Sequence, residues 1–339
     1  MPHQLTLTEF LEKAKTRPVL DVRSPGEFAH AHLPGAVNMP LFDNPERAEI
    51  GTIYKQIGKE DAVLRGLELV GPKLADFVRT ARDLTPDGGE VLVHCWRGGM
   101  RSGSVAWLLE TAGIPTATLQ GGYKAYRQAV LQAFENPLNL VVLGGKTGSG
   151  KTEVLHELAR RGEQVLDLEA LAHHRGSSYG MLGQPPQPSG EQFENLLFEE
   201  LRKLDPTRRI WVEDESRKVG TCVLPEGFWR QFLAAPVLAL DVPLEARVDF
   251  LVKTYGQFPR EQLRAATERI GKRLGHDRVK LALAALDQGD YAEVVRLTLA
   301  YYDKAYQHGL SLREAAKVKT IAVEGIDPAG NAERLLAEP

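Results

Sequence analysis

The stretch LNLVVLGGKTGSGKT, residues 138–152, is an apolar run followed by a loop rich in glycine. It matches the pattern G-x-x-x-x-G-K-[ST], and the segment that follows, KTEVLHELARRG, has apolar residues at helical spacing. A strand, a glycine loop and a helix in this order predict a phosphate-binding loop, because glycine lets successive backbone N–H groups turn toward one anion. The predicted phosphate-binding residues are Gly145, Lys146, Thr147, Gly148, Ser149, Gly150, Lys151 and Thr152.

The last two residues of this loop have separate roles. The ammonium group of Lys151 meets the charge of a diphosphate, and the hydroxyl of Thr152 can hold Mg²⁺. Strand ends line the ligand crevice in such sheets, so Asp167 and Asp214 are the candidates for ordering a metal or a nucleophile. Polar residues that simply face solvent are the alternative. The loop suits any diphosphate ester and does not by itself indicate ATP hydrolysis. The same strand ends also carry Glu169, Glu213 and Glu215.

Short strands and helices alternate on both sides of the loop. Expected strands cover 17–24, 90–95 and 115–122 before it, and 164–169, 208–215, 236–242 and 319–325 after it. This alternation predicts an α/β fold with mostly parallel sheets, and the pattern becomes mainly helical after residue 243. A chain of 339 residues suffices for two domains, which we expect at residues 1–135 and 136–339.

Composition excludes several classes of protein. Apolar content of 43% and charged content of 26% are ordinary for a soluble globular chain, and no run of about 18 uncharged apolar residues predicts a membrane span. The first residues, MPHQLTLTEFLEKAK, lack the pattern of a secretory signal. Two cysteines, Cys95 and Cys222, are too few for a disulfide framework, so we expect a cytoplasmic location. A net charge of −3 argues against a generally basic nucleic-acid coat.

A second glycine loop lies in VLVHCWRGGMRS, residues 91–102, where an apolar strand ends at a cysteine. The helix that we expect to begin near Ser102 would offer unpaired N–H groups, which favour a thiolate and any oxyanion beside it. Arg97 and Arg101 add fixed positive charge. A buried structural cysteine would need neither the arginines nor the glycine pair. Cys95 is therefore the predicted nucleophile, with Arg97 and Arg101 as its catalytic partners.

The spacing Cys-x5-Arg-Ser suits two kinds of electrophile. A phosphatase cradles a phosphoryl group with it, and a rhodanese uses a similar loop to carry a persulfide or its selenium counterpart. The stretch LDVRSPGEFAHAHLPGAVNMP, residues 20–40, resembles the rhodanese signature, which favours the second reading. Phosphatases built on the rhodanese fold share part of that signature, so the first stays open. Neighbouring side chains of a strand point to opposite faces, so we expect a structural role for His94 rather than that of a base.

Basic residues gather in REQLRAATERIGKRLGHDRVK, residues 260–280. On one helix Arg269, Lys272 and Arg273 would share a face, and these three are the candidate RNA-binding residues. A solvated charged face is the usual explanation for such a pattern. The segment therefore permits an RNA substrate without requiring one.

Several motifs together resemble the bacterial tRNA 2-selenouridine synthases over essentially the full length of the chain. The resemblance rests on CWRGGMRS (95–102), LQGGYKAYR (119–127), GGKTGSGKT (144–152), DLEALAHHRGSSYG (167–180), QPSGEQFEN (187–195) and EDESRKVG (213–220). It implies a rhodanese-like three-layer domain followed by a P-loop NTPase-like parallel-sheet domain with a helical C-terminal part.

The resemblance also implies an activity. Such transferases replace the sulfur of 2-thiouridine at the tRNA wobble position with selenium from selenophosphate, through an S-geranyl-2-thiouridine intermediate made from geranyl diphosphate. The phosphate loop would bind the diphosphate of geranyl diphosphate. Cys95 would handle selenium, with Arg97 and Arg101 holding selenophosphate or the phosphate that it releases. We expect tRNA as the partner, an enzyme supplying selenophosphate as a possible second one, and neither DNA nor a membrane. No tightly bound cofactor is expected, and Mg²⁺ is a possible addition.

Three other functions stay open at this point. A sulfurtransferase fused to a P-loop kinase or ATPase would turn over ATP through Lys151 without tRNA. A phosphatase with a regulatory nucleotide-binding domain would release phosphate from a generic aryl phosphate through Cys95. A carrier of sulfur or selenium would form a persulfide on Cys95 but would yield no product without an added enzyme.

Overall fold

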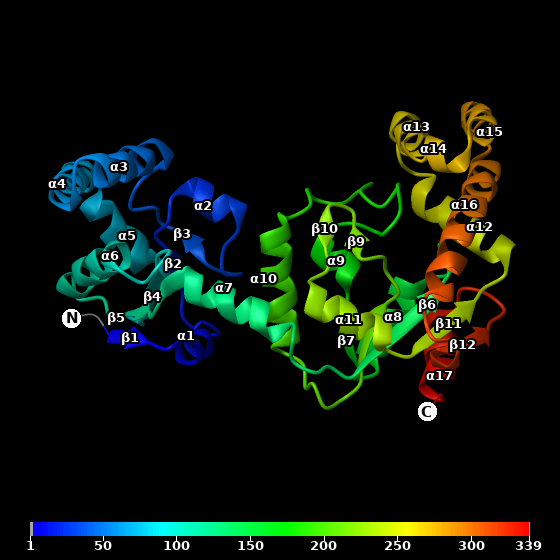
Figure 1. Cartoon of the computed structure of the whole chain (residues 1–339), viewed down its shortest axis with the longest axis horizontal. Coiled ribbons are helices and arrows are strands. Elements are labelled where there is room, and N and C mark those ends of the chain that lie inside the picture. The colour runs from blue at the N-terminus through cyan, green and yellow to red at the C-terminus, as the bar shows by residue number, and fades with distance from the viewer. Residues whose placement is uncertain (1–2, 339) are drawn as a thin grey trace. The chain divides into compact units, whose positions relative to one another are not determined.

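The chain forms two compact units, Met1–Ala133 and Phe134–Pro339, in a computed structural model that describes residues 3–338. Each unit is built around a five-stranded sheet whose neighbouring strands all run parallel (Figure 1). This arrangement confirms the predicted α/β class. Within residues 3–338, no helix is both long and apolar enough to cross a membrane.

The sheet of the first unit has the strand order β1-β5-β4-β2-β3. Its strands are β1 (His3–Leu5), β2 (Val19–Asp21), β3 (Val37–Asn38), β4 (Val91–His94) and β5 (Thr116–Leu119). Its helices are α1 (Leu7–Lys13), α2 (Pro25–His30), α3 (Asn44–Gln56), α4 (Lys59–Val70), α5 (Leu74–Leu84), α6 (Met100–Thr111) and α7 (Gly122–Ala133), with a 3-10 turn at Gly71–Lys73.

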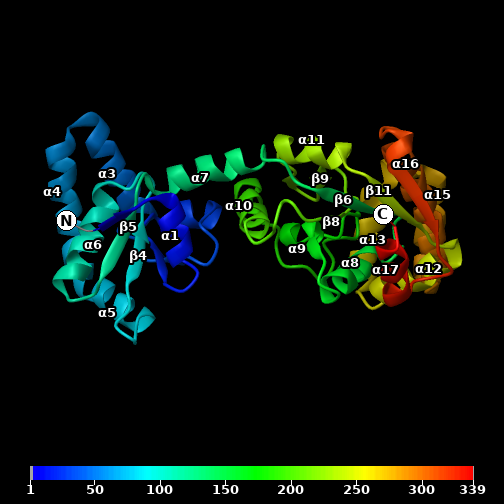
Figure 2. The ribbon, with the colours of Figure 1, turned by 90° about the horizontal axis from the view of Figure 1, so that it is seen from below.

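Helices cover both faces of this sheet, which gives three layers. Phe77 of α5 and Leu109 of α6 share one apolar core with Val91 and Val93 of β4. On the other face, α1 packs on the sheet through Phe10, and Figure 2 shows α1 and α6 on opposite sides of the strands. The three-layer prediction is confirmed.

The sheet of the second unit has the order β12-β11-β6-β8-β7. Its strands are β6 (Leu140–Gly145), β7 (Gln164–Leu166), β8 (Ile210–Glu213), β11 (Val237–Asp241) and β12 (Val318–Ala322), and a separate antiparallel pair comprises β9 (Lys218–Val219) and β10 (Cys222–Val223). Its helices are α8 (Lys151–Arg160), α9 (Leu168–Ala172), α10 (Gly190–Leu201), α11 (Glu226–Ala234), α12 (Leu244–Tyr255), α13 (Arg260–Arg269), α14 (Gly271–Leu274), α15 (His276–Gln288), α16 (Tyr291–Ser311) and α17 (Pro328–Leu336), with a 3-10 turn at Ala315–Lys317.

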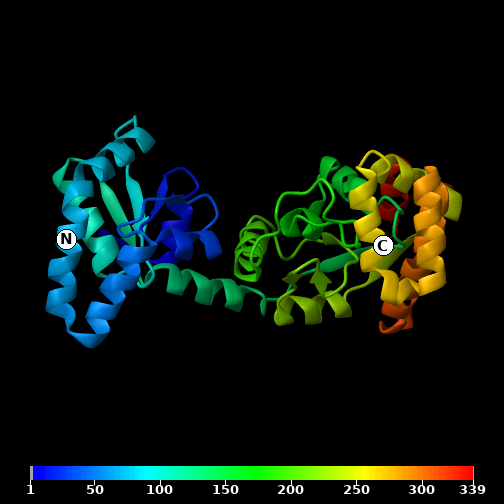
Figure 3. The ribbon, with the colours of Figure 1, turned by 90° about the horizontal axis from the view of Figure 1, so that it is seen from above.

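Helices α8 and α17 bury their apolar residues on one face of this second sheet, and α11 packs on the other (Figure 2). Helices α12, α13, α15 and α16 pack against one another, and Figure 3 shows them as the yellow and orange group beside the sheet. The predicted helical C-terminal part is therefore confirmed. Its longest member, α16, returns the chain toward the phosphate loop.

Two local expectations were wrong. Residues 260–280 do not form one helix: α13 ends at Arg269, α14 occupies Gly271–Leu274, and α15 begins at His276 after Gly275, whose φ is +94°. Glycine tolerates that left-handed conformation and so separates the helices. Strand β7 also ends earlier than expected, because the Asp167 side chain accepts a hydrogen bond from the Ala170 N–H and starts α9.

Candidate functional site

Cys95 lies directly after β4, and α6 begins five residues later at Met100. The start of α7 is hydrogen-bonded to this loop, because the Tyr123 N–H donates to the Cys95 carbonyl at 2.8 Å. Gly98 has a φ of +64°, and a Cβ there would lie 2.5 Å from the Leu119 carbonyl oxygen. Only glycine fits at this position, so Gly98 permits the turn of the loop beside the sulfur.

Hydrogen bonds around the sulfur favour its thiolate form. Burial raises the pKa of the Cys95 thiol, and contacts with the hydroxyl and N–H of Ser102 lower it. The N–H groups of Arg97 and Gly99 act in the same direction, and the resulting pKa is below the usual value. The Ser102 hydroxyl lies 3.2 Å from Cys95 Sγ and also 3.2 Å from the Gly99 carbonyl oxygen. It can therefore turn from the carbonyl to the sulfur when the thiol ionises.

The two predicted arginines differ in their surroundings. Arg97 is exposed, so its charge faces solvent beside the loop. Arg101 is less exposed and donates from Nη1 to Glu27 Oε2 at 3.1 Å. Burial raises the pKa of the Glu27 carboxyl, but the charge of Arg101 and the Ser24 N–H bring it below the usual value. Sequence reasoning did not identify Glu27 as a partner of Arg101, although its place three residues after Ser24 marks a helix capping box.

His94 faces away from the cysteine, as expected from strand alternation. Its ring is fully buried, with centroids 6.3 Å from Phe10 and 6.2 Å from Tyr123. Burial lowers the pKa of His94, which opposes protonation. Arg23 stacks on the same Tyr123 ring at 3.8 Å and is paired with buried Asp21. The Asp-Val-Arg part of the signature is therefore structural in this fold.

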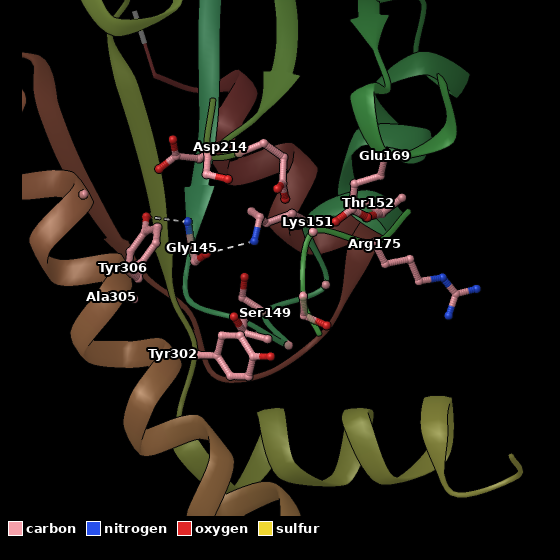
Figure 4. A pocket seen from close by; sticks show the side chains of 18 of the residues that line it. Gly145, Ser149, Lys151, Thr152, Glu169, Arg175, Asp214, Tyr302, Ala305 and Tyr306 are labelled. Carbon is pink, nitrogen blue, oxygen red and sulfur yellow. Dashed lines mark hydrogen bonds between the residues drawn. The ribbon is translucent and has the colours of Figure 1, made fainter. Parts of the chain in front are cut away.

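The phosphate loop has the predicted strand–loop–helix form, with β6 before it and α8 after it. Gly148 and Gly150 adopt left-handed φ values of +81° and +72°. Lys151 Nζ donates to the Gly145 carbonyl at 2.9 Å, which directs the ammonium group back over the loop (Figure 4). The buried Ser149 hydroxyl has no hydrogen-bond partner among the described residues. The predicted residues 145–152 thus form one continuous cradle.

A cavity of about 760 Å³ opens over this cradle. The loop, Lys151 and Thr152 line one side, and Figure 4 shows Tyr302 and Tyr306 of α16 facing the loop. The larger apolar side chains of the lining, which we call its apolar side, are Trp229, Leu233, Phe250, Leu251, Leu310 and Leu312, and Leu251 lies against Gly148 of the loop. The cavity therefore combines an anion site with an apolar wall, and its volume lies in the range of small-molecule pockets.

Each of the two predicted aspartates is hydrogen-bonded to a basic side chain. Asp167 accepts from His156 Nε2 at 2.9 Å, and Asp214 accepts from Arg313 Nη2 at 2.8 Å. Burial raises the pKa of Asp214 even though Arg313 stabilises its charge. Sequence reasoning missed Arg313, which is 99 residues away and belongs to no motif.

Two glutamates are linked to the cradle by hydrogen bonds. Glu169 Oε2 accepts from the Thr152 hydroxyl at 3.2 Å, and Glu213 Oε1 accepts from the Glu169 N–H at 2.8 Å. Burial raises the pKa of both carboxyls. Within residues 3–338, no group of three or more His, Cys, Asp and Glu side chains is arranged to hold a metal ion. Magnesium in a phosphate loop takes oxygens from threonine, phosphate and water, so Thr152 stays its predicted ligand.

The three candidate RNA-binding residues lie close in sequence but on two helices. Arg269 ends α13, whereas Lys272 and Arg273 belong to α14, and all three are exposed. Arg273 donates to the Tyr301 hydroxyl of α16 at 3.4 Å. We refer to Arg269, Lys272 and Arg273 as the α13–α14 basic cluster, and a role in RNA binding stays a prediction.

Known proteins match this chain over most of its length. A family model described as the AAA domain of tRNA 2-selenouridine synthase matches residues 138–326, and a model of the rhodanese-like domain matches residues 5–129. The tRNA 2-selenouridine synthase of Bordetella bronchiseptica is 37% identical over 341 residues, which cover 89% of this chain and 91% of that protein. The synthase of Bordetella petrii is 36% identical over 332 residues, or 86% of each chain. Both cradles lie inside the matched regions, and the chain belongs to the tRNA 2-selenouridine synthase family.

Proposed function

We propose that this protein makes 2-selenouridine in tRNA at the wobble position, in two transfers that use the two cradles in turn. In the first, the sulfur of 2-thiouridine attacks the C1 carbon of geranyl diphosphate. The carbon–oxygen bond breaks, diphosphate leaves, and the base loses its N3 proton. In the second, selenium from selenophosphate replaces the geranylated sulfur at C2. A C2–Se bond forms as the C2–S bond breaks and geranylthiol departs. One water then cleaves the Se–P bond, which releases inorganic phosphate and returns the proton to N3.

The cavity over the phosphate loop carries this proposal. Its polar side matches a diphosphate, because the loop amides and Lys151 meet negative charge as it develops on the leaving group. Its apolar side matches a hydrocarbon chain, and two members of that side, Leu233 and Leu312, are otherwise left 39% and 72% exposed. A nucleotide would use the phosphate side but would leave the aliphatic side chains without an apolar partner. An isoprenoid diphosphate uses both.

Cys95 serves the selenium transfer in this scheme. Its depressed pKa favours the thiolate, which is the form that acts as a nucleophile. Arg97 lies beside it with a charge that faces solvent, and an anionic donor such as selenophosphate would bind at such a position. Geranylation prepares the base for this step, because a thioether sulfur leaves more readily than the sulfur of a thiocarbonyl.

One assay tests the assignment of both cradles. Purified protein is incubated with tRNA containing 2-thiouridine, geranyl diphosphate and selenophosphate, and the nucleosides are analysed by mass spectrometry. The wild type should yield selenouridine, Cys95→Ala should accumulate the geranylated nucleoside, and Lys151→Ala should yield neither product. Geranylation that survives Lys151→Ala would show that the diphosphate binds elsewhere. ATP turnover that requires Lys151 and ignores tRNA would favour the kinase or ATPase alternative.

A further inference from the structure

A buried arginine lies beneath the tip of the phosphate loop. Arg247 belongs to α12 and is 2% exposed, and its Nη1 donates to the Thr147 carbonyl at 3.2 Å. Thr147 is the third residue of the eight-residue loop and directly precedes Gly148, whose φ is +81°. A Cβ at Gly148 would lie 2.7 Å from Leu251, so the tip of the loop rests directly on α12.

The arginine is itself oriented by a second helix. Asp303 of α16 accepts from Arg247 Nη1 and Nη2, each at 2.8 Å. Such a two-point contact fixes the plane of the guanidinium group, which a single charge contact would leave free to rotate. Arg247 Nε is buried and has no partner among the described residues, so the guanidinium group is held by the loop carbonyl and Asp303.

The same helix also holds the start of the loop. Tyr306 lies three residues after Asp303 on α16, and its hydroxyl accepts from the Gly145 N–H at 2.7 Å. Figure 4 shows this bond above the loop. One face of α16 therefore restrains the loop at its first residue directly and at its tip through Arg247.

We propose that Arg247, Asp303 and Tyr306 are positioning residues that hold the phosphate loop in the shape that binds a diphosphate. The inference rests on the proposed function, because the ligand is the diphosphate end of the ester. A glycine loop has many accessible backbone conformations, and only a narrow set turns its amides toward one anion. Restraint from outside the loop limits it to that set, and groups held in place in this way bind without first having to be ordered.

A role in positioning and a role through charge predict opposite results for one substitution. Asp303→Asn removes a negative charge close to the loop, so a purely electrostatic role for Arg247 predicts tighter binding of an anion. Positioning predicts weaker binding, because an amide cannot accept two N–H bonds from one guanidinium in the same way as a carboxylate. The direction of the change therefore distinguishes the two roles.

The test measures the binding of inorganic pyrophosphate to the full chain by isothermal titration calorimetry. We expect Asp303→Asn and Tyr306→Phe each to weaken binding about tenfold, as supporting contacts around a bound group commonly do. Binding of tRNA should not change. Arg296→Ala is the matched control: Arg296 of α16 pairs with Glu245 of α12 at 2.7 Å, but both side chains are exposed and neither bonds to the loop. It should bind pyrophosphate like the wild type.

Each outcome has a definite meaning. Unchanged or tighter binding by both variants would overturn the proposal, as would an equal loss in Arg296→Ala, which would point to general docking of the two helices. Because Asp303→Asn alters a largely buried pair, Tyr306→Phe, which keeps the ring, remains informative if the first variant does not fold. If the wild type binds neither pyrophosphate nor geranyl diphosphate, the proposed function itself is refuted. If the wild type binds and the variants match it, only the positioning role fails.

Discussion

Replacing Ser102 by alanine should lower the reactivity of Cys95 at pH values below the pKa of its thiol. At pH values above that pKa, the reactivity should match that of the wild type. In the thiolate form the Ser102 hydroxyl donates across 3.2 Å to the buried sulfur and gives up its bond to the Gly99 carbonyl. A hydrogen bond to a charged group contributes roughly 1.5–3 kcal/mol, and the neutral bond that is given up offsets about 1 kcal/mol of this. A net loss of about 1 kcal/mol lowers the thiolate population about fivefold at low pH.

The assay is the rate of alkylation of Cys95 by iodoacetamide across a range of pH. Peptide mass spectrometry separates Cys95 from Cys222, and burial raises the pKa of Cys222, so the second thiol should react at higher pH. Loss of the hydroxyl raises the pKa of Cys95, and the rate profile of the variant should therefore move to higher pH. Both proteins should reach the same plateau, because the plateau reports access to the sulfur rather than its ionisation.

Ser104→Ala is the matched control for this experiment. Ser104 lies on the same helix, is exposed, and donates to the Arg101 carbonyl at 3.1 Å without contacting the sulfur. It should give the wild-type profile. A constant ratio between Ser102→Ala and wild type at every pH would mean that the substitution changed access alone. That result would refute the argument that this hydroxyl stabilises the thiolate.

Three further predictions concern stability and RNA binding. Gly98→Ala should lower stability by about 3 kcal/mol in urea unfolding, because of its left-handed φ and the clash with backbone, whereas Gly103→Ala, which meets nothing within 4 Å, should be neutral or slightly stabilising. Arg313→Met should lower the free energy of unfolding by about 3 kcal/mol at neutral pH, because it leaves Asp214 buried without its cation. This loss should shrink in acid, where the carboxyl is protonated and needs no partner. A loss of stability that does not vary with pH would contradict the reasoning. Alanine at all three positions of the α13–α14 basic cluster should weaken tRNA binding. It should also reduce the magnitude of the slope of log affinity against log salt concentration by up to about three, and an unchanged slope would exclude phosphate contacts at this cluster.

Both cradles could be predicted from the sequence because each is built from consecutive residues. Each cradle is a loop between an apolar strand and a helix, with Cys95 after its strand and Lys151 at the start of its helix. The left-handed glycines in each loop have a conformational role that a sequence pattern conveys directly. The strand alternation that turned His94 away from Cys95 is equally local. These features need only the period of a strand, the period of a helix and the freedom of glycine.

The partners of these residues could not be predicted, because they are distant in the chain. Glu27 is 74 residues from Arg101, and Tyr306 is 161 residues from Gly145. No periodicity or motif links positions at such separations, and only the packing of helices on the sheets brings them together. Residues 260–280 were misjudged for a related reason: charge spacing suggested one face of one helix, but the glycines that divide the segment outweigh helical propensity.

The two loops share one design, and the comparison explains where function should be most sensitive. A glycine loop between strand and helix can bend around an anion, but the same freedom leaves its amides disordered unless other elements hold them. In the first unit the start of α7 holds the Cys95 loop through Tyr123, and in the second α16 holds the phosphate loop through Tyr306. Both contacts are made to the backbone of the loop, by the main-chain N–H of Tyr123 and by the side-chain hydroxyl of Tyr306. Tyr306→Phe should therefore weaken binding while leaving the residues of the loop in place, which is the pattern expected when the shape of the loop limits the reaction. A side-chain substitution at Tyr123 keeps its main-chain bond and should have less effect.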